Sequence, residues 1–82
     1  MNDAEVLALI RNALNDVVPD RAADWASIEL SQTIEELGLD SISTMEMVGQ
    51  LEDATGATFP DEELPKVNSL GDLATLVRKG KL

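Results

Sequence analysis

The chain has 82 residues, 44% of them hydrophobic, so it has room for one domain, residues 1–82, with a small core. It contains neither cysteine nor histidine, which excludes disulfides, thiolate nucleophiles, Cys/His zinc sites and catalytic triads that need an imidazole. The 16 acidic and 6 basic residues give a formal net charge of −10, which disfavours nucleic acid and anionic membranes as partners and favours basic protein surfaces.

The acidic residues dominate the middle of the chain, because no basic residue lies between Arg21 and Lys66. The same charges would also keep a small protein soluble, whatever its function. No segment is long enough to cross a bilayer, and the first residues, MNDAEVLALIRNAL, carry acids where a secretory or transit peptide would carry Lys or Arg. We therefore expect a cytoplasmic protein. We also expect it to be free-standing and monomeric.

An amphipathic helix is predicted over residues 3–17. Its apolar residues recur at helical spacing, namely Val6, Ile10, Ala13, Leu14 and Val17. Asn2, with Glu5 three residues later, is typical of a helix start. Pro19 ends the pattern, because proline cannot continue the hydrogen-bond ladder of a helix.

The following segment, PDRAADWASIELSQTIEELG, shows no long period. A structureless loop of this length is uncommon in a compact domain. We therefore expect part of it to fold, anchored by the apolar residues Trp25, Ile28, Leu30, Ile34 and Leu37. The run TIEEL before Gly38 predicts one helical turn closed by a glycine cap.

A second helix is predicted over residues 41–55, ending near Gly56, with Asp40 or Ser41 at its start. One face has the spacing of a core and consists of Thr44, Met47, Val48, Leu51 and Thr55. The other sides mix apolar side chains with carboxylates and consist of Ile42, Met45, Glu46, Gly49, Glu52 and Asp53. An exposed, acid-rimmed apolar patch around Met45 would suit a positively charged partner.

The region after this helix shows only a short pattern of secondary structure. Pro60 favours an extended Phe59, and residues 61–64 predict a single turn before Pro65. The acidic run DEELPKVNSLGD lacks the alternating oxygen ligands and the closing Glu of an EF-hand loop, so no calcium site is predicted.

A last helix is predicted after Ser69, which forms a capping-box pattern with Asp72. Its apolar residues are Leu70, Leu73, Ala74 and Val77. No segment alternates long enough to predict a strand. The predicted fold is therefore all-α, a small bundle of three main helices plus one short helix, with a long loop between helices one and two.

The stretch LGLDSIS, residues 37–43, allows two interpretations. An Asp-Ser pair before a helix commonly satisfies the free backbone N–H groups of the first turn. Ser41 could instead be a residue that another enzyme modifies. Serine without a base is a poor nucleophile, and the carboxylates form no recognisable acid–base pair, so we expect no enzyme activity from the chain itself.

The run ELGLDSISTMEMVGQLEDATGATFPDEELPKVNSLGDLATLV, residues 36–77, resembles the core of an acyl carrier protein. That family carries acyl intermediates as thioesters on a 4'-phosphopantetheine arm attached to serine. The resemblance implies that Ser41 is the attachment site and that Asp40 helps to present it. It also implies partner-binding roles for Ile42, Met45, Glu46, Glu52, Asp53 and Glu62.

The implied partners are a phosphopantetheinyl transferase and an acyl-loading enzyme, acyltransferase or ketosynthase with a basic docking surface. The chain has no thiol, so the attached arm would supply the one that forms the thioester. The acidic helix would steer docking without very tight affinity. Gly49 stands where the family commonly has a bulkier apolar residue, and we interpret it as letting a partner approach closely.

Leu39 and Ser43 stand where carriers of fatty-acid synthesis often have Ala and an acid. Leu-Gly-Leu-Asp-Ser is more similar to carriers of polyketide and hybrid polyketide–peptide pathways, which suggests a role in antibiotic-type biosynthesis. Fatty-acid and aminoacyl or peptidyl carriers are the alternatives. A different class of function, an acidic interaction module or nucleic-acid mimic, would make Ser41→Ala silent, whereas a carrier would lose its function.

Overall fold

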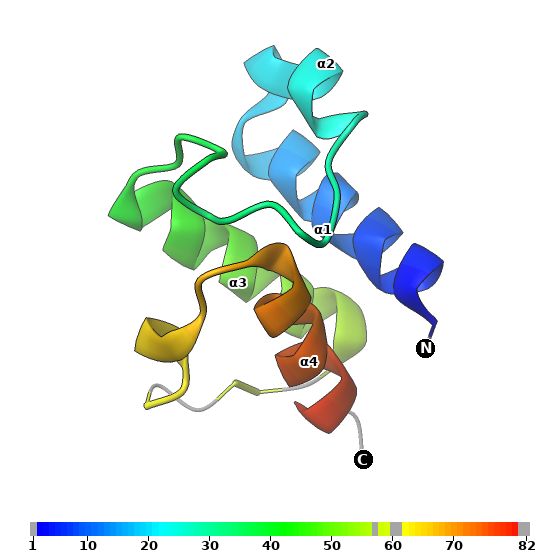
Figure 1. Ribbon diagram of the computed structural model, residues 1–82, viewed down its shortest axis with the longest axis vertical. Helices are drawn as coiled ribbons and strands as arrows, with labels where there is room; N and C mark the ends of the chain where they lie inside the picture. The colour runs from blue at the N-terminus through cyan, green and yellow to red at the C-terminus, as the bar shows by residue number, and fades with distance from the viewer. Residues whose placement is uncertain (1, 57, 60–61, 81–82) are drawn as a thin grey trace.

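Helix α1, Asp3–Val17, contacts each of the other α-helices in the computed structural model, which describes residues 2–56, 58–59 and 62–80 (Figure 1). The predicted start is confirmed, because Asn2 and Glu5 form a capping box in which each side chain accepts from the other's backbone N–H, at 2.8 and 3.1 Å. The apolar stripe faces inward: Val6, Ile10, Ala13 and Leu14 are buried.

Two short elements follow α1 where the sequence predicted only that part of the loop folds. A 3₁₀ helix, η1, spans Pro19–Arg21, and helix α2 spans Ala22–Trp25. Pro19 suits the first position of η1, where its missing N–H leaves no bond unmade. Trp25 is fully buried, and its Nε1 donates to the Val18 carbonyl oxygen at 2.9 Å, so this segment is closed against the end of α1.

The rest of the long segment is irregular but fixed to the fold. Of its predicted anchors, Ile28 and Leu37 are buried like Trp25, whereas Leu30 and Ile34 are half-buried. The predicted helical turn before Gly38 takes the form of tight turns and not of a helix, because the Leu37 and Gly38 N–H groups donate to the Ile34 and Glu35 carbonyl oxygens three residues earlier. The predicted closing glycine is confirmed, since Gly38 has φ of +72°.

The first turn of helix α4, Leu70–Gly80, holds this loop in place. The Leu70 and Gly71 N–H groups donate to the Gln32 and Leu30 carbonyl oxygens at 2.9 and 2.8 Å. The first N–H groups of a helix have no acceptors inside the helix, and here the loop supplies the acceptors from a distant part of the chain. The loop that leads to Ser41 is thereby tied to α4.

Helix α3, Ser41–Thr55, lies beside α1 and ends at Gly56, whose φ is +71° (Figure 1). Its predicted core face is confirmed at Met47, Val48 and Leu51, which are buried. Thr44 and Thr55 are only half-buried, and their hydroxyls donate to the Asp40 and Leu51 carbonyl oxygens four residues earlier.

The predicted turn over residues 61–64 extends further than expected, because Glu62 and Glu63 lie in a turn that continues into a 3₁₀ helix. A 3₁₀ helix, η2, spans Leu64–Lys66 and contains Pro65 rather than ending before it. Proline fits the early positions of such a turn, because no internal bond needs its N–H there. Pro60 and Asp61, part of the same prediction, lie outside the described residues.

The capping box of the last helix is confirmed. Ser69 Oγ accepts from the Asp72 N–H at 3.1 Å, and the Asp72 carboxylate accepts from the Ser69 N–H at 3.2 Å. The described residues contain helices and turns and no strand, with one isolated bridge between Thr33 and Ser69. The all-α prediction is therefore confirmed. None of the buried residues in the described part of the chain is polar or charged.

Candidate functional site

Ser41 is the first residue of α3, and its side chain is exposed. Asp40 directly before it caps the helix, since its carboxylate accepts from the Ser43 N–H at 2.7 Å. This bond, together with hydrogen bonds from the Ser43 side chain and the Ile42 N–H, lowers the pKa of Asp40 below its usual range. The sequence left Asp40 and Ser41 open as the residue that caps the helix, and the structure shows that it is Asp40.

The Ser41 hydroxyl makes no side-chain hydrogen bond within the part of the chain that the structure describes. It is thus free for chemistry that does not disturb the helix start. The preceding residues hold it in place: Leu37 is buried, Gly38 turns the chain, and Leu39 packs against the core. An exposed hydroxyl with its backbone anchored on both sides suits modification by another protein.

The outward sides of α3 carry the apolar residues that the sequence predicted to be exposed. Ile42 is 73% exposed and Met45 is 56% exposed. Glu46 and Asp53 are exposed on the same helix, and Gly49 lies between them. The structure therefore presents an acid-rimmed apolar surface along α3, beginning one residue after Ser41.

Glu52 has a partner inside the protein, which the sequence did not indicate. Its carboxylate accepts from the Phe59 N–H at 2.7 Å, and Phe59 is buried. The bond ties the segment after α3 back to the helix. Glu52 thus has a structural role beside the docking role predicted for it, whereas Glu62 is exposed two residues before η2.

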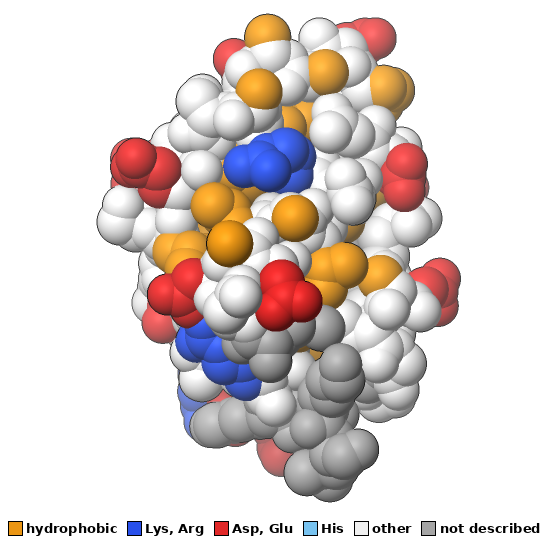
Figure 2. Space-filling view, turned by 90° about the vertical axis from the view of Figure 1, so that its right-hand side faces the viewer, with side chains coloured by type: hydrophobic (Ala, Val, Ile, Leu, Met, Phe, Trp, Pro, Cys, Tyr) orange, Lys and Arg blue, Asp and Glu red, His pale blue; other side chains and the backbone are white. Residues whose placement is uncertain are grey.

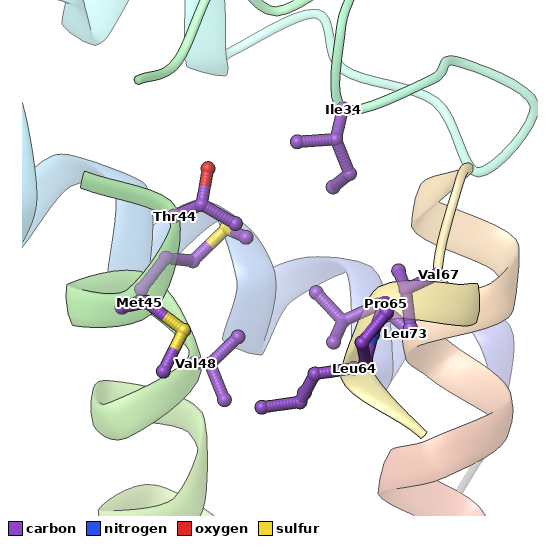
Figure 3. Close-up of a pocket in the computed structure, with 9 residues that line it drawn as sticks. Ile34, Thr44, Met45, Val48, Leu64, Pro65, Val67 and Leu73 are labelled. Carbon is purple, nitrogen blue, oxygen red and sulfur yellow. The ribbon is translucent and has the colours of Figure 1, made fainter. Parts of the chain in front are cut away.

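An apolar pocket of about 270 Å³ lies between α3, η2 and α4. Figure 3 shows Met45 and Val48 on α3 facing Leu64 and Pro65 of η2, with Ile34 of the long loop at another side. Met45 therefore belongs both to the exposed surface and to the pocket wall. Sequence reasoning missed this pocket, because its walls come from segments far apart in the chain and only folding brings them together.

The acidic character of the sequence persists on the folded surface. Figure 2 shows carboxylates spread over one face around two small groups of basic side chains. The ion pairs in the described residues join Arg21 to Asp24, Lys66 to Glu63 and Arg78 to Asp3. None of these pairs involves α3, so the exposed carboxylates of Glu46 and Asp53 are not neutralised by an ion pair among the described residues.

Two negative results concern other kinds of site. Within residues 2–56, 58–59 and 62–80, no group of three or more His, Cys, Asp or Glu residues is placed to hold a metal ion. No helix in the same residues is long and apolar enough to span a membrane.

The fold and the exposed serine define a small helical domain suited to covalent modification. The family model described as "Phosphopantetheine attachment site" matches residues 4–77. The match covers most of the chain, and the protein therefore belongs to this family of phosphopantetheine carriers, whose members attach 4'-phosphopantetheine as a prosthetic group. No solved structure matched the chain.

The residues of the site fit such a group. An unpaired, exposed hydroxyl at Ser41 can form a phosphodiester without breaking a described bond. The N-terminal end of a helix is also a favourable place for a phosphate, because the helix dipole is positive there. When bound, the group supplies the thiol that the chain lacks.

Proposed function

We propose that Ser41 is the attachment point of 4'-phosphopantetheine and that the protein holds acyl intermediates as thioesters and presents them to partner enzymes. The observation that carries the proposal is the division of roles at the start of α3. Asp40 caps the helix, and the Ser41 hydroxyl remains exposed and makes no hydrogen bond among the described residues. Membership of a family that attaches 4'-phosphopantetheine supports this assignment.

The modification can be written as a balanced transfer. The Ser41 Oγ forms a bond to the phosphorus that carries pantetheine in coenzyme A, and the P–O bond of the pyrophosphate breaks. Adenosine 3',5'-bisphosphate leaves, and a base of the transferase accepts the serine proton. In this step the chain contributes a fixed and accessible hydroxyl, while the transferase contributes the acid–base chemistry.

We place the carrier in polyketide or hybrid polyketide–peptide biosynthesis, with fatty-acid and aminoacyl or peptidyl carriers as the alternatives. The support is the LGLDSIS motif, in which Leu39 and Ser43 stand where carriers of fatty-acid synthesis often have Ala and an acid. Loading rates of the modified protein with malonyl, fatty acyl and aminoacyl donors, each with its own loading enzyme, distinguish these pathways. Faster fatty acyl or aminoacyl loading would replace the polyketide assignment.

The first experiment is the intact mass of the protein after incubation with coenzyme A, magnesium and a broad-specificity phosphopantetheinyl transferase. We expect the wild type to gain one phosphopantetheine and Ser41→Ala to gain none. Ser43→Ala is the matched control, because it removes a neighbouring hydroxyl from the same helical turn and should still be modified.

A known carrier modified in parallel shows that the transferase is active. If the folded wild type gained no mass beside it, the carrier proposal would fail, and an acidic interaction module would be the function to test. Modification of Ser41→Ala would instead move the attachment site to another residue.

A further inference from the structure

Two methionines of α3 differ sharply in their exposure to solvent. Met45 is 56% exposed, whereas Met47, two residues later on the same helix, is fully buried. A flexible thioether side chain usually fills space in a core, as that of Met47 does. The exposure of Met45 leaves its sulfur open to small reactive molecules in the solvent.

Hydrogen peroxide is the reactant that fits this sulfur. A sulfur lone pair attacks one peroxide oxygen, the O–O bond breaks, and the departing hydroxide takes the proton of the transferred oxygen and leaves as water. The sulfur gives up two electrons to the peroxide and becomes a sulfoxide. Hydrogen peroxide is neutral, so the formal net charge of −10 on the chain does not repel it.

A sulfoxide at Met45 does not suit the pocket that this residue lines. Figure 3 shows Met45 facing Leu64 across the apolar pocket. Of the residues that line this pocket, Thr44 is the polar one, and its hydroxyl already donates to the Asp40 carbonyl oxygen at 2.8 Å. A sulfoxide oxygen inside the pocket would therefore lack a donor, and burying it there would cost free energy.

The oxidised side chain therefore turns outward, onto the surface beside Ser41. Met45 lies one helical turn from Ser41, a rise of about 6 Å along α3. Its exposed neighbour Ile42 contributes the other large apolar side chain on the outward sides of this helix. Oxidation replaces an apolar contact with a polar group at this surface.

We propose that Met45 is a site of reversible oxidation, at which hydrogen peroxide forms a sulfoxide and thereby weakens docking of the enzyme that modifies Ser41. The reaction at the sulfur stands by itself, whereas its effect on docking rests on the proposed function. Met47 escapes the reaction because it is buried. The oxidation state of Met45 thus sets how fast the chain becomes a carrier.

The first test locates the added oxygen. The folded, unmodified protein is treated with hydrogen peroxide, freed of peroxide with catalase, then unfolded and cut after glutamate. Cleavage after Glu36, Glu46 and Glu52 separates Met45, in residues 37–46, from Met47, in residues 47–52. We expect Met45 to gain oxygen at least about tenfold faster than Met47. In urea the two rates should be comparable, and equal rates in the folded protein would overturn the inference.

The second test is the rate of phosphopantetheine transfer from coenzyme A by a broad-specificity transferase, measured for each protein before and after peroxide treatment. Oxidation should raise KM for the wild-type chain about threefold or more with kcat little changed, because docking and not chemistry is affected. Met45→Leu should show no change on treatment, and it controls for oxidation of Met1. Met47→Leu, a swap of similar volume, should respond like the wild type. An unchanged KM after complete oxidation of Met45 would overturn the proposed effect on docking.

Two further measurements separate oxidation of one side chain from general damage. Methionine sulfoxide reductases that act on the two sulfoxide epimers should return KM to its starting value. Circular dichroism should show the same helical signal before and after treatment, because Met45 lies at the surface. A rise in KM that accompanied loss of helix, or that the reductases did not reverse, would overturn the role of Met45.

The two proposals fail in different ways. If the wild type were not modified by the transferase, the carrier proposal would fail, although peptide mapping would still show whether Met45 is oxidised. If the wild type were modified with the same KM before and after oxidation, Ser41 would stand as the attachment site and only the role of Met45 would be wrong.

Discussion

Asp40 and Ser41 are adjacent residues with separate tasks at the start of α3. The Asp40 carboxylate accepts from the Ser43 N–H and stabilises the first turn, so Ser41 is not needed as a cap. A serine that also capped its helix would weaken that turn whenever it was modified. The separation allows the hydroxyl to change chemically while the helix start stays as it is.

The lowered pKa of Asp40 makes its contribution to stability depend on pH. A carboxyl whose folded pKa lies below its unfolded value of about 3.9 stabilises the fold above that value and loses the effect as pH falls through the folded pKa. Asp40→Asn should therefore melt below the wild type at about pH 5–7, and the difference should shrink as pH falls below about 4 and vanish once pH lies below the folded pKa of Asp40.

Thermal unfolding followed by circular dichroism across this pH range measures the effect. Asp20→Asn is the control for the loss of one negative charge, because the Asp20 carboxylate makes no hydrogen bond within the described chain. A difference between wild type and Asp40→Asn that stayed constant down to about pH 2 would show that the carboxylate charge does not matter at the cap.

At the scale of elements, α3 is both the proposed surface for partners and a support for the segment that follows it. Ile42 and Glu46 are exposed, whereas Met47 and Leu51 on the opposite side are buried. Glu52 supports the following segment, because its carboxylate accepts a hydrogen bond from the Phe59 N–H. The acidic residues of one helix thus do not all serve the same purpose.

Glu52→Ala and Glu46→Ala form a matched pair on α3. Glu52→Ala leaves the part-buried Phe59 N–H without its acceptor and should lower the free energy of unfolding by about 1–2 kcal/mol. Glu46→Ala should change it by less than about 0.5 kcal/mol, because Glu46 is an exposed surface residue. Urea unfolding measures both, and equal losses would contradict the structural role of Glu52.

The same pair bears on docking. Glu46→Ala should slow modification of Ser41 at low ionic strength, and the penalty should shrink as salt screens the attraction to a basic partner. A Glu46→Ala rate equal to that of the wild type at low salt would move the docking surface away from this part of α3.

At the scale of the whole molecule, the charge imbalance is the dominant electrostatic feature. The chain has a formal net charge of −10, and the described ion pairs are few and at least partly exposed. Exposed pairs contribute little to stability, so they do not offset the repulsion among the carboxylates. The folded state holds these charges closer together than the unfolded chain does.

Added salt should therefore stabilise the protein. The melting temperature should rise by several degrees between about 10 mM and 500 mM NaCl, and MgCl₂ should raise it more at equal ionic strength because a divalent cation screens clustered carboxylates better. Differential scanning calorimetry measures this. A melting temperature independent of ionic strength would show that the charges are too dispersed to repel one another appreciably.

The sequence by itself determined the three long helices. Each carries its own start signal and an apolar stripe at helical spacing, and these local patterns act within a few residues: Asn2 with Glu5, Asp40 before α3, and Ser69 with Asp72. The LGLDSIS motif likewise placed Asp40 and Ser41 at the start of α3, because that signal lies in adjacent residues.

Only the tertiary structure decided how the remaining segments are held. Residues 34–38 form tight turns instead of the predicted helical turn, and the preceding loop binds the start of α4 through its Leu30 and Gln32 carbonyl oxygens. The pocket beside Met45 and the bond from the Phe59 N–H to Glu52 also join distant positions. Such contacts depend on which segments meet after folding, and no local pattern encodes that choice.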